Sequence, residues 1–436
     1  MLPVKILNRI PDFRRLMKPK AWRSRNIVAK LLLAVLGFLL GGTVAEVALR
    51  IAGYSAPEFY SLDQTRGYAL RPGTEGWFQR EGAAYVRINS DGLRDREHSI
   101  TKPPNVFRIA LLGDSYPEAF SVAMENAFWS VMERKLQECD AFRGQQVEVL
   151  NFGVSGYGTG QELLTLREQV WKYSPDIVML AVTTNNDVID NSRVLKKTDK
   201  IPYFVYRDNQ LTLDESFRNS RVFLGRQSPV NRFGRWLRDH SRVVQAAVEG
   251  HRGFRIWLAS RRAKRAQSAS AGVTEAKETG ETPKNEDLLL LAEQFGTEHL
   301  VYREPLNQEW SDAWRVTEGL IAAMRDEVRS RGVRFVVVTL SNGPQVQPEP
   351  KVREEFKKRW GITDLFYPDH RIRSLCMREQ IPVITLAPEL QEFAEQKNVY
   401  LHGFESNSGD GHWNTTGHRV AGELMAKKLC EGGLLK

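Results

Sequence analysis

Three residues of this chain have the chemistry of a hydrolytic triad. Ser115 stands in a Gly-Asp-Ser tripeptide, and Asp410 and His412 stand close to the C-terminus in an Asp-Gly-His tripeptide. An imidazole can take the proton of a serine hydroxyl and make it a nucleophile, while a carboxylate holds the imidazole in the correct tautomer. In an extended segment, residues two positions apart point to the same side. We therefore predict Ser115 as nucleophile, His412 as general base and Asp410 as the acid that orients it.

Two further motifs offer hydrogen-bond donors for the oxyanion that such a reaction forms. Residues 151–159 contain three glycines, which let a backbone turn tightly and present its N–H groups. Residues 183–187 read Thr-Thr-Asn-Asn-Asp and supply side-chain amides. Each motif alone is equally compatible with an ordinary loop or a helix cap, so its position in the fold decides its meaning.

The elements around these motifs alternate between strands and helices. Between the predicted strands, apolar residues recur at helical spacing, as at 128–138, which predicts amphipathic helices. Five continuous apolar runs predict buried strands at 106–114, 147–153, 176–187, 334–340 and 381–387. This alternation predicts a parallel sheet that helices cover on both faces. Active sites of such sheets lie beyond the carboxyl ends of the strands, and three of the motifs above follow such ends. The motif with Asp410 and His412 precedes the last predicted helix.

Taken in order, the motifs resemble the SGNH hydrolases, also called GDSL hydrolases. The family's successive blocks correspond to Ser115 in GDSY, Gly156 in NFGVSGYGT, Asn186 in TTNND, and Asp410 with His412 in DGHWN. The resemblance covers about 106–187 and 334–430. It implies an α/β fold, a flavodoxin-like three-layer α/β/α sandwich, that hydrolyses or transfers an ester-linked acyl group. It also implies an oxyanion hole made by the N–H groups of Ser115 and Gly156 and the amide of Asn186, without a metal or organic cofactor.

Two positions depart from the family pattern. Thr184 stands where the third block usually has glycine, and one residue rather than two separates Asp410 from His412. The shorter spacing is similar to that of membrane-linked SGNH proteins that handle O-acetyl groups on exported polysaccharides. The resemblance therefore favours a serine esterase acting on an ester-bearing substrate such as an acetylated envelope glycan. An O-acyltransferase with the same triad, or a catalytically degraded glycan-binding or assembly protein, are the alternatives.

The basic charge of the chain belongs to its N-terminal segment. Residues 1–30 hold nine basic side chains and one acid, and so carry +8 of the formal charge of +9. The remainder is nearly neutral, which argues against a nucleic-acid partner. A helix over 27–49 would be about 34 Å long and could cross a membrane. We predict a single-pass anchor with a cytoplasmic tail and a catalytic domain facing the periplasm or cell exterior; a cleaved signal peptide and a buried helix are the alternatives.

These patterns divide the 436 residues into six segments. The segments are a basic tail (1–30), an anchor (31–49), an irregular lead-in (50–105), the first part of the hydrolase core (106–190), a helical and partly disordered insertion (191–314) and the second part of the core (315–436). Within the insertion, the low-complexity run 267–286 predicts a disordered loop. Its arginines, such as Arg232, Arg235, Arg238, Arg261 and Arg262, suit either solvent or an anionic lipid or glycan.

The chain has three cysteines, Cys139, Cys376 and Cys430. Three cysteines permit at most one internal disulfide, which excludes a disulfide-rich scaffold. None belongs to a Cys-x-x-Cys pair, so no zinc or redox motif is present. The sequence leaves their redox state and the oligomeric state of the protein open.

Overall fold

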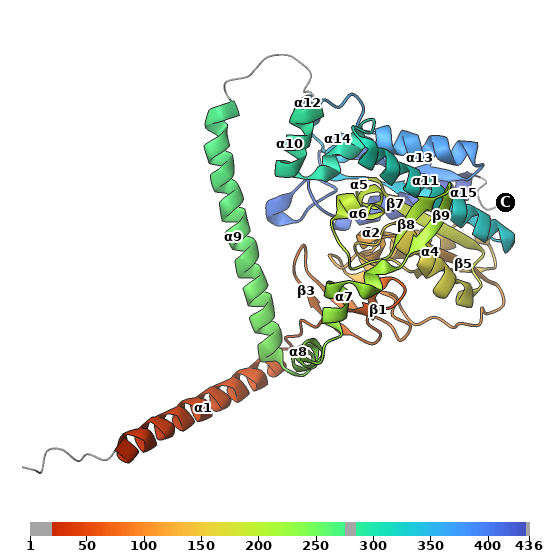
Figure 1. Cartoon of the computed structure of the whole chain (residues 1–436). Helices are drawn as coiled ribbons and strands as arrows, with labels where there is room; N and C mark the ends of the chain where they lie inside the picture. Colours follow the sequence, from red (N-terminus) through yellow and green to blue (C-terminus); the bar gives the residue numbers. More distant parts are fainter. Residues whose placement is uncertain (1–19, 275–284, 433–436) are drawn as a thin grey trace, which may run out of the picture.

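A five-stranded parallel sheet forms the centre of the molecule. The structure, a computed structural model, describes residues 20–274 and 285–432 (Figure 1). The strands are β5 (Val106–Leu112), β6 (Gln146–Asn151), β7 (Ile177–Thr183), β10 (Arg334–Leu340) and β11 (Val383–Thr385). They lie in the order β11-β10-β7-β5-β6. Counted by appearance in the chain, this is the order 2-1-3-4-5 of flavodoxin-like folds, which confirms the fold class expected from the sequence.

Helices cover both faces of this sheet, because successive residues of each strand point to opposite sides. In β7, Val178 and Leu180 belong to one apolar cluster and Ile177 and Met179 to the other. The first cluster includes α4 (Thr159–Glu168), α11 (Gln308–Ser330) and α13 (Tyr367–Arg378). The second includes α3 (Phe128–Gln137), α14 (Ala387–Lys397) and α15 (Thr415–Glu431). The result is the three-layer sandwich.

We expected the segment between β7 and β10 to be helical and partly disordered. The structure corrects this expectation, because the segment also contains strands. It contains an antiparallel hairpin of β8 (Tyr203–Arg207) and β9 (Gln210–Asp214). The turn residues Asp208 and Asn209 both have positive φ angles, of 49° and 62°, which is the conformation of a tight hairpin turn. The helices of this segment and the remaining core helices are α5 (Thr184–Asp190), α6 (Arg193–Lys196), α7 (Arg221–Arg226), α8 (Pro229–His240), α9 (Arg242–Thr274), α10 (Asn285–Phe295) and α12 (Pro350–Trp360).

The run expected to be a disordered loop lies only partly within the described residues. Its first residues, 267–274, continue α9 as helix, which corrects the expectation for that part. Residues 275–284 lie outside the described residues, and the last two residues of the run begin α10.

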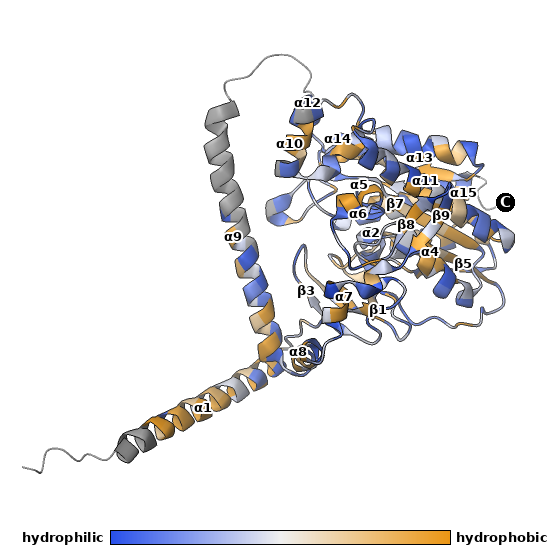
Figure 2. Ribbon diagram, viewed as in Figure 1, coloured by the Kyte–Doolittle hydropathy of each residue, from blue (hydrophilic) through white to orange (hydrophobic). Residues whose placement is uncertain are grey.

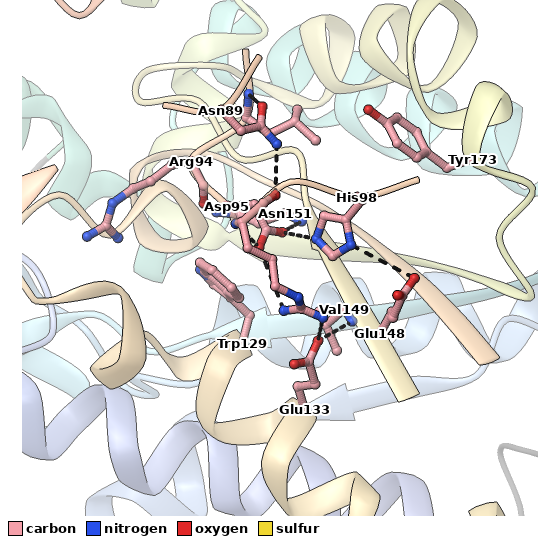
Figure 3. A network of polar contacts seen from close by, with 12 residues as sticks. Asn89, Arg94, Asp95, His98, Trp129, Glu133, Glu148, Val149, Asn151 and Tyr173 are labelled. Carbon is pink, nitrogen blue, oxygen red and sulfur yellow. Dashed lines mark hydrogen bonds and ion pairs between the residues drawn. The ribbon is translucent and has the colours of Figure 1, made fainter. Parts of the chain in front are cut away.

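The lead-in is bound tightly to the sandwich. It forms two antiparallel hairpins, β1 (Tyr60–Asp63) with β2 (Gly67–Leu70) and β3 (Glu75–Phe78) with β4 (Ala84–Arg87). Figure 3 shows the polar network that follows them, in which His98 lies between Asp95 and Glu148. The carboxylate of Asp95 also accepts the backbone N–H of Asn151 at 2.9 Å. This network fixes the lead-in against the edge strand β6.

The N-terminal helix α1 (Lys20–Ile51) stands away from the rest of the molecule (Figure 1). Its segment Ile27–Ile51 has a mean hydropathy of 2.2 in its most apolar stretch and is not buried against the protein. In Figure 2 most of the ribbon of this segment has the colour of hydrophobic residues. The helix is therefore long and apolar enough to cross a membrane, although a signal sequence has the same properties.

A disulfide joins Cys139, just after α3, to Cys430, near the end of α15. The two helices pack side by side, and the Cα atoms of the two cysteines are 6.2 Å apart. Cys376 is a buried free thiol in α13.

Candidate active site

Ser115 lies on a single helical turn at the carboxyl end of β5. It begins α2 (Ser115–Glu118), and the side chain of Asp114 caps this turn by accepting the N–H of Tyr116 at 3.0 Å. The turn ends at Ala119, which has a left-handed φ of 51°. Ser115 is half-buried, whereas its neighbours on the turn are buried. The fold thus presents one hydroxyl group at the edge of the sheet.

The structure brings Ser115 and His412 together, as predicted. The Oγ atom of Ser115 lies 2.8 Å from Nε2 of His412, which is a hydrogen bond in the geometry needed for proton transfer. His412 stands in the loop before α15. A second histidine fixes this loop, because Nδ1 of the buried His402 lies 2.7 Å from the carbonyl oxygen of Gly411. Asn414 then caps α15.

The acid that contacts His412 is Glu81, which the sequence analysis did not identify. Its Oε2 lies 2.5 Å from Nδ1 of His412, and its Oε1 accepts the backbone N–H of His412 at 2.7 Å. The prediction that Asp410 orients His412 is corrected by this geometry. Asp410 is exposed, and its carboxylate accepts the N–H of Gly411 instead.

The backbone conformation at Gly411 explains why Glu81, and not Asp410, contacts His412. Its φ of +80° breaks the extended conformation in which Asp410 and His412 would share a side. A Cβ atom at this position would lie 2.1 Å from Oε1 of Glu81. The glycine therefore both turns Asp410 away and leaves room for the carboxylate of Glu81, which reaches the site from the turn between β3 and β4.

Glu81 and His412 each stabilise the charged form of the other. Burial alone would lower the pKa of His412, but the hydrogen bond and negative charge of Glu81 outweigh it and raise that pKa. Burial likewise acts to raise the pKa of Glu81, yet the contacts with His412 lower it overall. Glu81 is thus ionised at neutral pH and stabilises the imidazolium that forms when His412 takes a proton.

The donors expected of an oxyanion hole are the backbone N–H groups of Ser115 and Gly156 and the side-chain amide of Asn186. Within the described ranges, neither backbone N–H has a hydrogen-bond acceptor. Gly156 has a φ of +75°, and a Cβ atom there would lie 2.9 Å from the hydroxyl of Tyr68, so the position requires glycine. The side-chain amide of Asn186 donates one hydrogen to Asp114 at 3.0 Å and has a second available.

Thr184 opens α5 where the family pattern usually has glycine. Its hydroxyl is buried and accepts a hydrogen bond from the side chain of Asn342 at 3.0 Å. The residue therefore ties the end of β7 to the loop after β10, and Asn186 contacts Asp114, which precedes Ser115.

A further acid, Glu118, is fully buried and contacts the Gly156 loop. Its carboxylate accepts the N–H of Ser155 at 3.0 Å and the hydroxyl of Tyr60 at 2.8 Å. Burial raises the pKa of Glu118 to about 7, against these hydrogen bonds and the charges of Arg94 and His412. Glu118 thereby holds the backbone of the residue before Gly156.

Comparison with known proteins shows similarity of structure but none of sequence: no protein-family model and no curated protein matches the chain. The structure is similar to that of an acetyl xylan esterase, with a TM-score of 0.35 and 13% identity over 74% of this chain and 99% of the other. It is also similar to a putative lipolytic protein of the G-D-S-L family from Desulfitobacterium hafniense DCB-2, with a TM-score of 0.32 and 13% identity over 73% and 98%. A third is a catalytic mutant of Axe2, an acetylxylan esterase from Geobacillus stearothermophilus, with a TM-score of 0.34 and 10% identity over 74% and 94%. At these identities the similarity concerns the fold alone.

Proposed function

We propose that this chain is a membrane-anchored serine esterase that acts on an ester-linked acyl group, such as the O-acetyl group of an envelope glycan. One observation carries the proposal: a continuous chain of hydrogen bonds runs from Ser115 Oγ through His412 to the carboxylate of Glu81. Three side chains from segments far apart in the sequence meet in the order that nucleophilic catalysis requires.

The first half of the reaction forms an acyl-enzyme. His412 accepts the proton of Ser115 as the hydroxyl oxygen attacks the ester carbonyl, and Glu81 stabilises the imidazolium. The N–H groups of Ser115 and Gly156 and the amide of Asn186 supply hydrogen bonds to the oxyanion. Removal of one such donor typically costs about 3 kcal/mol of activation free energy. His412 then returns the proton to the departing alcohol.

The second half releases the acyl group. A water molecule gives up a proton to His412 and attacks the acyl carbonyl. The bond between the acyl group and Ser115 Oγ then breaks, and His412 returns the proton to Ser115 as the free acid leaves, which makes the protein an esterase. A sugar hydroxyl in place of water would make it an O-acyltransferase with the same residues. Product analysis with and without a glycan acceptor separates the two activities.

The location that we propose is the outer face of a membrane, with the catalytic domain in the periplasm or cell exterior. The apolar α1 and the basic residues before it support this orientation. The disulfide between Cys139 and Cys430 agrees with an oxidising compartment.

Hydrolysis of p-nitrophenyl acetate by the full-length protein in detergent tests the proposal. We expect the Ser115→Ala variant to lose at least about 10³-fold in kcat while it keeps the circular dichroism spectrum of the parent. A fluorophosphonate probe should label the parent at Ser115 and leave the variant unlabelled. If the folded parent neither hydrolyses esters nor reacts with the probe, the proposal is wrong and a glycan-binding or assembly role replaces it.

A further inference from the structure

A cavity of about 550 Å³ lies beside the candidate oxyanion loop. Ser155 and Gly156 form part of its wall, and Arg80, which precedes Glu81 in the chain, forms another part. The rest of the wall comes from Glu58 and the first hairpin of the lead-in and from the segment between β7 and β10. A volume of this size is typical of small-ligand sites, and the cavity wall includes Gly156 of the proposed oxyanion hole.

The wall of this cavity is strongly basic. A single carboxylate, Glu58, lines it, and this carboxylate is paired with Arg238 at 2.5 Å. The cationic side chains of the wall are Arg80, Lys196, Lys200, Arg226 and Arg235. The cavity therefore has a large excess of positive charge for its size.

Three of these cations have no counterion of their own. Lys196 is paired with Asp190, whereas Arg80 reaches Glu249 only at 4.0 Å. The side chains of Lys200, Arg226 and Arg235 form no ion pair or hydrogen bond with any residue in 20–274 or 285–432. Unpaired cations that gather in one concave site favour an anionic ligand.

The remaining wall is polar and aromatic. It includes the rings and hydroxyls of Tyr60 and Tyr68, the hydroxyls of Ser61 and Thr198, and the amide of Asn231. Only Leu62 and Ile201 are aliphatic among the described lining residues. Hydroxyl, amide and aromatic groups suit sugar rings, while an acyl chain would need an apolar lining.

We propose that this cavity binds an acidic glycan, with carboxylates of its sugars held by Lys200, Arg226 and Arg235. Arginine matches the two oxygens of a carboxylate with paired hydrogen bonds. The inference rests on the proposed function in one respect: the sugar that bears the ester would lie at the Gly156 end of the cavity, next to Ser115. Binding of the glycan itself needs no catalysis.

Calorimetric titration of the full-length Ser115→Ala protein with an unesterified oligouronate tests this inference. The matched ligand is the same oligosaccharide with its carboxylates reduced to alcohols. We expect saturable binding of the acidic form alone, weakened about tenfold in Arg235→Gln, as for loss of one charge-assisted hydrogen bond. The control is Arg232→Gln, because Arg232 stands on the same helix α8 but does not line the cavity.

Equal binding of both oligosaccharides, or unchanged binding in Arg235→Gln, would overturn the inference. Binding of anionic phospholipid vesicles in competition with the oligouronate would assign the cavity to a lipid head group instead and would also overturn it. Ester hydrolysis by the parent protein remains a separate result, so failure of this inference and failure of the proposed function can be told apart.

A second observation, independent of the cavity, concerns the outer face of α8. Four large apolar side chains on this helix are exposed: Val230 (80%), Phe233 (62%), Trp236 (52%) and Leu237 (38%). The opposite face packs on the protein through Arg238, which is buried and paired with Glu58 and Glu249. The helix is thus amphipathic with its apolar side turned outward.

The end of α8 is fixed to the end of the apolar helix α1. Arg50 of α1 donates to the carbonyl oxygen of His240 at 2.8 Å. Glu46, one turn earlier, accepts the backbone N–H groups of Arg242 and Val243 at 3.0 Å. Figure 1 views α8 nearly along its axis while α1 lies across the picture, so the two helices run crosswise.

We infer that α8 lies in the surface of the membrane that α1 crosses, with Val230, Phe233, Trp236 and Leu237 in the lipid. A helix that runs crosswise to the spanning helix at its exit point lies along the membrane plane. Tryptophan is favoured at this depth, and an amphipathic helix with basic residues on its polar face is typical of such a position.

A fluorescent label on Phe233→Cys, in full-length protein in nanodiscs of phosphatidylethanolamine and phosphatidylglycerol, tests this placement. We expect lipid-attached quenchers to reduce its emission and aqueous quenchers to leave it largely unchanged. The control is Lys351→Cys on α12, where the side chain is 89% exposed and lies far from α1 (Figure 1). If the two labels respond alike to the aqueous quencher, α8 does not lie in the membrane.

Discussion

The carboxylate of Glu81 contacts His412 twice, at the backbone N–H and at Nδ1, although 331 positions separate the two residues. One oxygen fixes the place of the histidine backbone and the other fixes the tautomer of its ring. The lead-in hairpin that carries Glu81 is therefore part of the active site.

The first prediction distinguishes Glu81 from Asp410. In Glu81→Gln the amide would donate toward Nδ1 of His412, which would put the imidazole proton on Nε2 and prevent it from accepting the proton of Ser115. We expect kcat for p-nitrophenyl acetate to fall about 10³- to 10⁴-fold. Asp410→Asn is the matched control and should leave kcat essentially unchanged, because Asp410 is exposed. A larger loss in Asp410→Asn than in Glu81→Gln would restore the acid expected from the sequence.

The pH dependence of hydrolysis follows from the raised pKa of His412. The base must be neutral, so kcat/KM should rise with pH, and its midpoint should lie above the ordinary histidine pKa of about 6.5. In Glu81→Gln the opposing effect of burial remains, and the midpoint of the residual activity should move to lower pH. A rate profile of both proteins measures the two midpoints, and an unchanged midpoint in the variant would contradict the role given to Glu81.

Gly411 leaves room for the carboxylate of Glu81, and the third prediction tests this role. An alanine there would bring its Cβ atom to 2.1 Å from Oε1 of Glu81 and should displace the carboxylate, with a large loss of kcat. Gly144→Ala provides the control, because Gly144 has a similar φ of +84° but no neighbour within 4 Å of the added atom. Both variants carry about 1 kcal/mol of backbone strain. Only Gly411→Ala should lose activity, and equal losses would mean that strain alone is responsible.

Sequence reasoning succeeded where the pattern was local. The strand Arg334–Leu340 was predicted with its observed bounds, because a continuous apolar run between turn signals leaves few alternatives. Ser115 was identified because it follows a continuous apolar strand, and His412 because it precedes a segment with helical periodicity. Ser115 follows the strand β5 directly and so lies at the active edge of the sheet. His412 lies in the loop before α15, and its meeting with Ser115 also depends on the contact of His402 with Gly411 that holds this loop.

The triad acid could not be found in the same way. Glu81 is one of 53 acidic residues, and nothing in its neighbourhood in the chain marks it. Its contact with His412 depends on how a hairpin outside the sandwich folds back over the sheet edge. The assignment of Asp410 failed because it assumed an extended backbone at Gly411.

The fourth prediction concerns stability. Glu162 in α4 is 1% exposed, and both of its carboxylate oxygens lack a hydrogen-bond partner in the part of the chain that the structure describes. Burial, together with the charges of Asp114 and Asp190, raises its pKa well above the usual value. The folded state then holds a proton that the unfolded state has lost, so this residue reduces stability increasingly as the pH rises above about 4.3.

Glu162→Gln should therefore raise the free energy of unfolding at pH 8 by about 1–3 kcal/mol. The gain should shrink toward pH 5, and urea titrations of both proteins at the two pH values measure it. If the stability gain of Glu162→Gln over the parent were smaller at pH 8 than at pH 5, the raised pKa of Glu162 would be contradicted.

The disulfide between Cys139 and Cys430 encloses most of the catalytic domain, since its two cysteines are 291 positions apart. Ser115 lies before the enclosed part and His412 lies within it. A protease that cuts one peptide bond between the two cysteines therefore releases no fragment until the disulfide is reduced. The nicked protein would migrate as an intact chain on a non-reducing gel, and its nucleophile and base would stay covalently joined after the backbone between them is broken.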